Sequence, residues 1–324
     1  MKIRLSPENI PITATISLFF LIYMIGAFMY TGFFSLRVFV NLFIDNAFLG
    51  IIAVGMTFVI ISGGIDLSLG SVIAFTSIFA AKMITVYHFH PVLVIIFSLV
   101  IGSLAGLTMG SLIHYFSLPP FLVTLVGMFL FRGMAFLVSL NSIPIKHEFF
   151  TRIVQFGIPL GGGVFLSAPA LIFIIVLIIG AYILRFTRFG RNVYAIGGNE
   201  QSAILMGLPV GRTKIAIYTM NSTLCALAGI AYALYTSSGY ALACVGLELD
   251  AIAAVVIGGT LLTGGIGFVE GTLVGVLILG LIQTFITFQG TLSSWWTKIV
   301  IGILLFIFIL LQRYLAKSRI DAKF

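Results

Sequence analysis

Long stretches of this chain carry no charged side chain. No Lys, Arg, Asp or Glu lies between Lys82 and Arg132, and the same is true of residues 153–184 and 215–247. A charge at the centre of a bilayer costs several kcal/mol, and roughly 20 consecutive apolar residues cross the hydrocarbon core. The pattern therefore predicts that the chain crosses a lipid bilayer several times.

Charges, prolines and glycine clusters divide the chain into about ten apolar segments. These are residues 11–31, 46–62, 67–81, 92–116, 121–140, 167–184, 215–236, 251–265, 269–289 and 296–314. They predict an all-α membrane protein, a polytopic bundle of about ten transmembrane helices in which residues 1–324 form a single transmembrane domain. The first apolar run is too long for the core of a cleaved signal, so we expect it to remain as a helix.

The distribution of positive charge predicts the orientation of the bundle. An even number of spans places both termini on one side, and Lys and Arg concentrate near both termini and within residues 185–214. The opposite side carries only Arg37, Lys82, Lys146, Arg152 and Lys298 under this division. Because short cytoplasmic loops are rich in Lys and Arg, we predict that both termini are cytoplasmic.

Composition agrees with a lipid environment and argues against other classes. With 60% hydrophobic and 8% charged residues, the chain has too little polar surface to coat a soluble domain. The net charge of +8 is scattered at segment ends rather than clustered with aromatic residues, so nucleic acid is not a predicted partner. Cys225 and Cys244 lack metal-ligand spacing, and no carboxylate or cysteine set surrounds the histidines, so no metal site is predicted.

Two loops are long enough to carry function. Residues 141–166 should form an irregular external loop over the outer mouth. In the internal loop, residues 185–214, Asn199 suits a helix N-cap, Gly207 a left-handed helix end, and Pro209 a stop. We therefore predict a short cytoplasmic helix at residues 200–206. Such a helix does not persist alone in water, so it should dock either on a partner protein or on the inner surface of this chain.

A short internal sequence repeat occurs at two of the apolar segments. Residues 63–70 read GGIDLSLG and residues 258–265 read GGTLLTGG, although so short a match also arises by chance. The segments that carry it, 67–81 and 251–265, are the shortest, and 15 helical residues extend only about 22 Å, less than the roughly 30 Å hydrocarbon core. Paired short segments of this kind indicate a transport pathway, so we predict two broken or re-entrant segments.

Polar side chains near these breaks or inside spans are the candidates for a translocation path: Asn46, Asp66, Ser68, Arg132, Asn221 and Thr263. Glu248 and Asp250 precede the second break. A charge inside the membrane is a functional candidate by default. The alternative is structural: Asp66 would cap the next half-helix, and Arg132 would hold carbonyl groups freed by a break.

The sequence contains no recognisable catalytic or ATP-binding motif. The string closest to a phosphate-binding loop is GLPVGRT at residues 207–213, which lacks the required pattern, so any ATP would be hydrolysed by another subunit. A secondary transporter would share the paired short segments but needs an ion-coupling site and no docking helix. A membrane-embedded enzyme would need a set of catalytic residues, and the sequence shows no motif for one.

Three stretches together resemble a known family. They are LGIIAVGMTFVIISGGIDLSLGSVIAF at 49–75, RFGRNVYAIGGNEQSAILMGL at 188–208 and ELDAIAAVVIGGTLLTGG at 248–265. They are similar to the permease subunits of bacterial sugar-importing ABC transporters of the ribose, xylose and galactose class. The resemblance implies a non-catalytic subunit of the bacterial inner membrane. Its partners would be a cytoplasmic ATPase that binds ATP and Mg²⁺, a periplasmic sugar-binding protein and a second permease.

The same resemblance implies that residues 185–214 form a coupling loop to the ATPase. The residues that it assigns to this role are Arg188, Gly190, Tyr194, Asn199, Glu200, Ala203, Met206 and Gly207. Residues 45–60 and 290–313 are most similar to the smaller permeases of galactofuranose importers, which use two different permease chains. Glu270 departs from that likeness, because a neutral residue is expected there, and this leaves the depth of segment 269–289 open.

Overall fold

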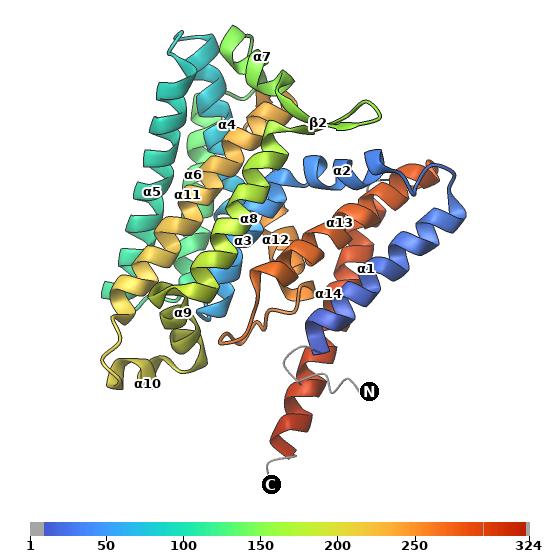
Figure 1. Ribbon diagram of the computed structural model, residues 1–324. Helices are drawn as coiled ribbons and strands as arrows, with labels where there is room; N and C mark the ends of the chain where they lie inside the picture. Colours follow the sequence, from blue (N-terminus) through green and yellow to red (C-terminus); the bar gives the residue numbers. More distant parts are fainter. Residues whose placement is uncertain (1–9, 294, 322–324) are drawn as a thin grey trace.

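The computed structural model describes residues 10–293 and 295–321, which form a mainly helical bundle (Figure 1). The helices are α1 (Ile10–Met29), α2 (Leu36–Asp45), α3 (Ala47–Ile61), α4 (Leu69–Thr85), α5 (Pro91–Tyr115), α6 (Pro120–Val138), α7 (Glu148–Gln155), α8 (Ala168–Phe186), α9 (Arg188–Gly198), α10 (Glu200–Leu205), α11 (Val210–Thr236), α12 (Leu247–Ile257), α13 (Val269–Gln289) and α14 (Trp295–Asp321). The strands are β1 (Ile143–Pro144), β2 (Gly157–Gly161), β3 (Val164–Ser167) and β4 (Ser238–Gly239).

Each predicted apolar segment overlaps a helix, but ten membrane crossings are not confirmed. In the described part of the chain, five helices are long and apolar enough to span a bilayer, namely α5, α6, α8, α11 and α13. A sixth span results if α2 and α3, which meet at 58°, are counted as one. Helix α2 was not predicted, because Arg37 and Asp45 interrupt the apolar run that would have revealed it.

The two segments predicted to be broken are irregular beside their helices rather than inside them. Helix α4 is continuous over 17 residues, and the irregular backbone precedes it at residues 62–68. Helix α12 ends at Ile257, and residues 258–268 continue as turns and irregular backbone. The glycines at 63, 259, 264 and 265 have positive φ, which places these residues outside the helices.

Helix α3 forms the centre of the bundle. Of its 15 residues, 14 are buried, and it packs against α8, α11, α12 and α13. Its glycines let the neighbouring helices approach closely, since a Cβ at Gly50 would lie 2.2 Å from the Phe173 ring and one at Gly55 would lie 2.3 Å from Oδ1 of Asn221. Beside it, α5 and α11 approach closely, since a Cβ at Gly106 would lie only 2.3 Å from the carbonyl oxygen of Tyr218. Small residues allow such contact between membrane helices.

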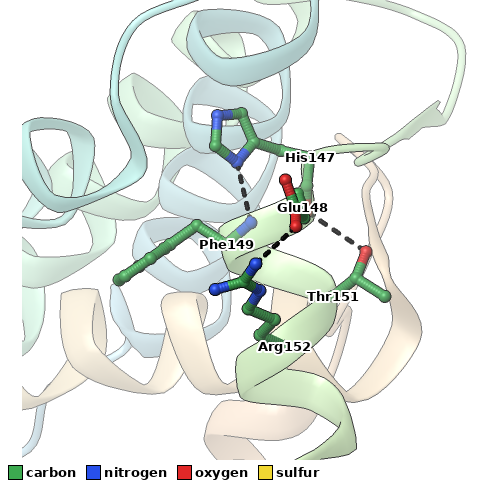
Figure 2. Close-up of polar contacts among 5 residues, drawn as sticks. All are labelled: His147, Glu148, Phe149, Thr151 and Arg152. Atoms are coloured by element: carbon green, nitrogen blue, oxygen red, sulfur yellow. Dashed lines mark hydrogen bonds and ion pairs between the residues drawn. The ribbon is translucent and has the colours of Figure 1, made fainter.

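The predicted external loop is more ordered than expected. Strand β1 pairs with β4, β2 pairs with β3 as a hairpin, and α7 lies between β1 and β2. Figure 2 shows the start of α7, where Nδ1 of His147 accepts a hydrogen bond of 3.2 Å from the N–H of Phe149. One turn along, Arg152 pairs with Glu148 at 2.5 Å. These local contacts make residues 141–166 a structured cap at the end of the bundle far from α10 (Figure 1).

Candidate functional site

The segment between α3 and α4 is anchored by one buried carboxylate. Asp66 is fully buried, and its Oδ1 accepts hydrogen bonds from the N–H of Ser68 at 2.8 Å and from its hydroxyl at 2.6 Å. Its Oδ2 accepts a bond of 2.8 Å from Nδ2 of Asn221 on α11. The structure thus brings together three of the six predicted path residues. The structural alternative for Asp66 is met only in part, because this carboxylate accepts from the N–H of Ser68, the residue before α4, and from no N–H inside the helix.

The surroundings of Asp66 are polar but incompletely bonded. The hydroxyl of Thr124 on α6 accepts a bond of 3.2 Å from the N–H of Leu67, which ties the same segment to a third helix. Among the described residues, the buried Tyr218 hydroxyl and Oδ1 of Asn221 have no hydrogen-bond partner. A Cβ on Gly64 would lie 2.3 Å from the Tyr218 hydroxyl, so this side chain faces the segment. Buried polar atoms are usually hydrogen-bonded, so these two atoms are exceptions within the cluster.

Arg132 and Asn46 lie apart from this cluster. One guanidinium nitrogen of Arg132 donates to the carbonyl oxygens of Ala241 at 2.7 Å and Ala243 at 2.8 Å. This is the structural alternative predicted for Arg132, because the carbonyls belong to non-helical backbone before α12. Asn46 is buried where α2 bends into α3, and its Nδ2 donates to the carbonyl of Leu42 at 2.9 Å.

Thr263 lies in the second glycine-rich segment, which packs beside the end of α3. The N–H of Gly265 donates a hydrogen bond of 2.8 Å to the carbonyl of Ile61, so the repeated segments 63–70 and 258–265 lie next to each other. Thr263 is exposed there. In the described part of the chain, no hydrogen bond connects it to the Asp66 cluster.

The predicted coupling loop contains two helices instead of one. The short helix is present as α10, in which Oδ1 of Asn199 accepts a hydrogen bond of 2.8 Å from the N–H of Ser202. Gly207 follows it with a φ of 75°. The additional helix is α9, which begins where the hydroxyl of Thr187 accepts from the N–H of Gly190 at 3.1 Å. Helix α9 was not predicted from the sequence, because its three glycines favour loops.

Helix α9 is fixed to the bundle and carries three of the predicted coupling residues. The hydroxyl of Tyr194 donates to the carbonyl of Gly267 at 2.7 Å. Burial, followed by the nearby charge of Glu270, raises the pKa of Tyr194 to about 12. Gly190 packs against the end of α8, where a Cβ would meet the carbonyl oxygen of Leu184 at 2.1 Å, and Arg188 is exposed at the helix start.

Helix α10 presents a buried side and an exposed apolar side. Ala203 is fully buried against this chain's own Ile196 and Val210, so that residue docks internally. Glu200 pairs with Lys214 at 2.7 Å across the loop. By contrast, three consecutive apolar side chains at the tip are exposed: Ile204 by 56%, Leu205 by 88% and Met206 by 67%. Leu205 was not among the predicted coupling residues, although its position next to Met206 could have indicated this role.

Two adjoining cavities lie at the other end of α3, on either side of Asn46 and Gln283. One, of about 190 Å³, is lined by Val38, Asn41, Asp45, Asn46, Gly280, Gln283, Thr284, Thr287 and Phe288. The other, of about 380 Å³, is lined by Asn46, Leu49, Val245, Asp250, Leu279, Gln283, Trp295, Thr297, Lys298 and Ile301.

These cavities combine amide, hydroxyl and charged groups with aromatic rings. Asp45 accepts a hydrogen bond of 3.0 Å from the Tyr235 hydroxyl, and Lys298 pairs with Asp250. Of the lining residues, Asn46 was predicted from the sequence to lie on the path. Gln283 was not predicted, although the sequence could have indicated it: it is the only carboxamide before Gln289 in the apolar stretch 269–289.

Comparison with known proteins gives a consistent family. The family described as branched-chain amino acid transport system / permease component matches residues 38–309. The chain is 56% identical over 306 residues to the inner membrane ABC transporter permease protein YjfF of Escherichia coli (strain K12), covering 94% of this chain and 92% of that protein. No solved structure matches the chain.

Two further relatives are named as import permeases. The chain is 38% identical over 316 residues to the fructose import permease protein FruG of Bifidobacterium longum, covering 96% of this chain and 92% of that protein. It is 40% identical over 280 residues to the ribose import permease protein RbsC of Bacillus subtilis, covering 84% of each. Since the family match extends over residues 38–309 of 324, this chain belongs to the family described as branched-chain amino acid transport system / permease component.

Proposed function

We propose that this protein is the inner-membrane permease subunit of an ATP-driven sugar importer. Its relatives are named as fructose and ribose import permeases and as an ABC transporter permease. The observation that carries the proposal is the pair of cavities around Asn46 and Gln283. Amide and hydroxyl groups can bond sugar hydroxyls, and aromatic faces can cover the apolar side of a sugar ring. The larger cavity, of about 380 Å³, falls within the size range of small-molecule sites.

We propose galactofuranose as the cargo and a heterodimer of two permeases as the assembly. Residues 45–60 and 290–313 carry the likeness to that subgroup, and both segments contribute to the larger cavity. The first supplies Asn46 and Leu49, and the second supplies Trp295, Thr297, Lys298 and Ile301. Ribose, xylose or galactose is the alternative cargo within the same class. A secondary transporter is a weaker alternative, since one relative is named as an ABC transporter permease and another as an import permease.

The cargo is tested on the complete system, with its ATPase, its binding protein and both permeases. We expect the binding protein to retain galactose in the furanose form in preference to ribose, xylose or galactopyranose, as read from the NMR spectrum of the bound labelled sugar. A preference for a pyranose would contradict galactofuranose and leave the sugar-importer proposal intact.

The cavity is tested by substitution of one of its amide groups. Gln283→Leu removes a hydrogen-bonding group that is worth about 0.5–1.5 kcal/mol, so uptake of labelled sugar should fall roughly two- to tenfold. Gln155→Leu is the matched control, because Gln155 is exposed on α7 and lines neither cavity. Equal uptake by wild type and Gln283→Leu would place the cargo elsewhere.

The coupling role belongs to the tip of α10 in our proposal. A cytoplasmic ATPase, which would bind ATP and Mg²⁺, covers Ile204, Leu205 and Met206, whose exposure is otherwise unfavourable. We accordingly propose that both termini and residues 185–214 lie in the cytoplasm. In Figure 1, the first turn of α1, the last turn of α14 and helix α10 lie toward the same end of the molecule, as this topology requires.

Charge at the tip should separate the permease from its ATPase. Leu205→Glu and Met206→Glu lie on exposed positions, so the chain should insert and melt normally while co-purification of the ATPase and sugar uptake are lost. Leu160→Glu, on the exposed hairpin β2–β3, serves as the control. Ala203→Glu is unsuitable for this test, because Ala203 is buried and its substitution would disturb the fold. Normal ATPase binding by Leu205→Glu would contradict the coupling assignment.

A further inference from the structure

A cavity of about 550 Å³ lies where the membrane helices α8 and α13 meet α9. Its lining comes from the end of α8, from α9 and from the start of α13: Ala181, Leu184, Arg185, Arg191, Tyr194, Phe268 and Glu270. Because α8 ends and α13 begins here, the cavity lies at the boundary between the apolar and the polar part of the protein. Ala181 and Leu184 line it with apolar groups, whereas its charged groups come from the end of α8, from α9 and from the start of α13.

The charged groups of this cavity are only loosely engaged with one another. Arg185 and Glu270 approach to 4.0 Å, and their side chains are 73% and 52% exposed. Arg191 is exposed and forms no ion pair with any described residue. An exposed pair at this distance contributes little to stability, so these groups remain available to a ligand. The cavity thus offers two guanidinium groups and one carboxylate.

An exposed apolar stripe leads along α8 to the charged groups. Ile175, Ile178, Tyr182 and Phe186 recur every three or four residues and are each more than half exposed, at 54%, 62%, 61% and 63%. They therefore share one face of the helix. The guanidinium of Arg185 lies 5.7 Å from the centre of the Phe186 ring, which places the positive charge at the end of the stripe. An acyl chain fits such a stripe, and a headgroup fits its charged end.

We propose that this cavity binds a phospholipid with a phosphoethanolamine headgroup. Its phosphate is bound by Arg185 and Arg191, since guanidinium groups form strong, forked hydrogen bonds with phosphate. Its ammonium is bound by Glu270, and one acyl chain lies along the α8 stripe. The carboxylate favours this lipid over an anionic one without a cation, which Glu270 would repel. The proposal accounts for the unexpected acidic residue at 270 and requires a bilayer around α8, but it does not depend on which cargo is transported.

The proposal is tested by lipid retention during native mass spectrometry of the purified transporter. Wild type should retain phosphatidylethanolamine about tenfold better than phosphatidylcholine, whose methylated ammonium cannot donate hydrogen bonds to Glu270. Glu270→Gln should abolish this preference. Arg191→Gln should weaken retention of both lipids, because both carry the phosphate. Glu148→Gln and Arg152→Gln are the matched controls, since they form an exposed pair on α7, at the other end of the molecule.

Several outcomes would overturn the proposal. Equal retention of the two lipids by wild type would remove the role of the ammonium, and stronger retention of phosphatidylglycerol would show an anionic-lipid site instead. Displacement of the lipid by an equal concentration of glycerophosphoethanolamine would identify the free headgroup as the ligand. Retention by the isolated permease but not by the complete transporter would show that a protein partner covers the cavity. A preference that survives in Glu270→Gln would place the lipid elsewhere on the chain.

Discussion

The two glycine-rich segments share a pattern, but they are held in different ways. In residues 63–70, Asp66 is buried and accepts three hydrogen bonds from Ser68 and Asn221. In residues 258–265, Leu261 occupies the position equivalent to Asp66, and the backbone makes the contact instead, from the N–H of Gly265 to Ile61. Glycines therefore determine where each helix stops, whereas a single carboxylate determines whether side chains or backbone fix the segment.

The difference has a consequence for the elements that each segment joins. The first connects α3 and α4 to α11, through the bond between Asp66 and Asn221. The second connects the end of α3 to α9 and α13, because a Cβ on Gly264 would lie 2.9 Å from the carbonyl oxygen of Gly197. The end of α3 is thus supported on one side by a polar cluster and on the other by close backbone packing. The first support should be the stronger one.

Loss of the buried carboxylate should have the largest effect on stability. Asp66→Leu copies the second segment into the first and leaves the amide of Asn221 and the backbone N–H of Ser68 without acceptors. Each unsatisfied buried group costs about 1–3 kcal/mol, so we expect a loss of roughly 3 kcal/mol or more in the free energy of unfolding. Thermal unfolding in detergent measures the change.

The exposed equivalent of Ser68 provides the control for this experiment. Thr263→Leu should leave the melting temperature within about 1 °C of wild type, because exposed substitutions rarely change stability by more than about 0.5 kcal/mol. If Asp66→Leu unfolded at the same temperature as Thr263→Leu, the buried cluster would not anchor the segment.

A smaller loss is expected from side chains added to the second segment. Gly264 has a φ of 83°, and an alanine there would be strained by roughly 1–2 kcal/mol as well as crowding the carbonyl oxygen of Gly197. Gly198→Ala is the matched control, because a Cβ at Gly198 meets nothing within 4 Å. We expect Gly264→Ala to lower the melting temperature and sugar uptake while Gly198→Ala retains both. Equal behaviour of the two variants would show that this packing is not required.

The sequence predicted the helices better than their boundaries and partners. Long charge-free runs located α5, α6, α8, α11 and α13, because the cost of a charge in lipid leaves a clear signal. Helix α2 was not predicted, because its charged residues are typical of loops. Helix α9 was not predicted, because glycines are also typical of loops. The number of membrane crossings could not be read from apolar runs alone, because helices buried in protein, such as α3 and α4, are as apolar as helices that face lipid.

The candidate site was predictable only in part, since polar residues reveal their type but not their partners. Asp66, Ser68 and Asn221 were all identified, yet their mutual bonding depends on how α11 packs against α3, over 155 residues of separation. Arg132 and Asn46 are bound to backbone carbonyls, which no sequence pattern specifies. Gln283 and Leu205 were missed, because their importance comes from a cavity and an exposed tip that exist only in the folded chain.

The smallest effect is expected from the contact between α9 and Gly267, just after the second segment. Tyr194→Phe removes the hydrogen bond to the carbonyl of Gly267 and should reduce the free energy of unfolding by about 1 kcal/mol. Burial and the charge of Glu270 raise the pKa of Tyr194 from 10.0 to about 12, so the hydroxyl is more easily ionised in the unfolded chain. The stabilisation is therefore complete below pH 10 and should be lost as the pH rises toward 12. The difference in melting temperature between wild type and Tyr194→Phe should narrow over that interval, whereas a constant difference would contradict a buried, protonated donor. Tyr182→Phe, on the exposed stripe of α8, should melt like wild type at every pH, which would assign the pH-dependent difference between wild type and Tyr194→Phe to the bond between Tyr194 and Gly267.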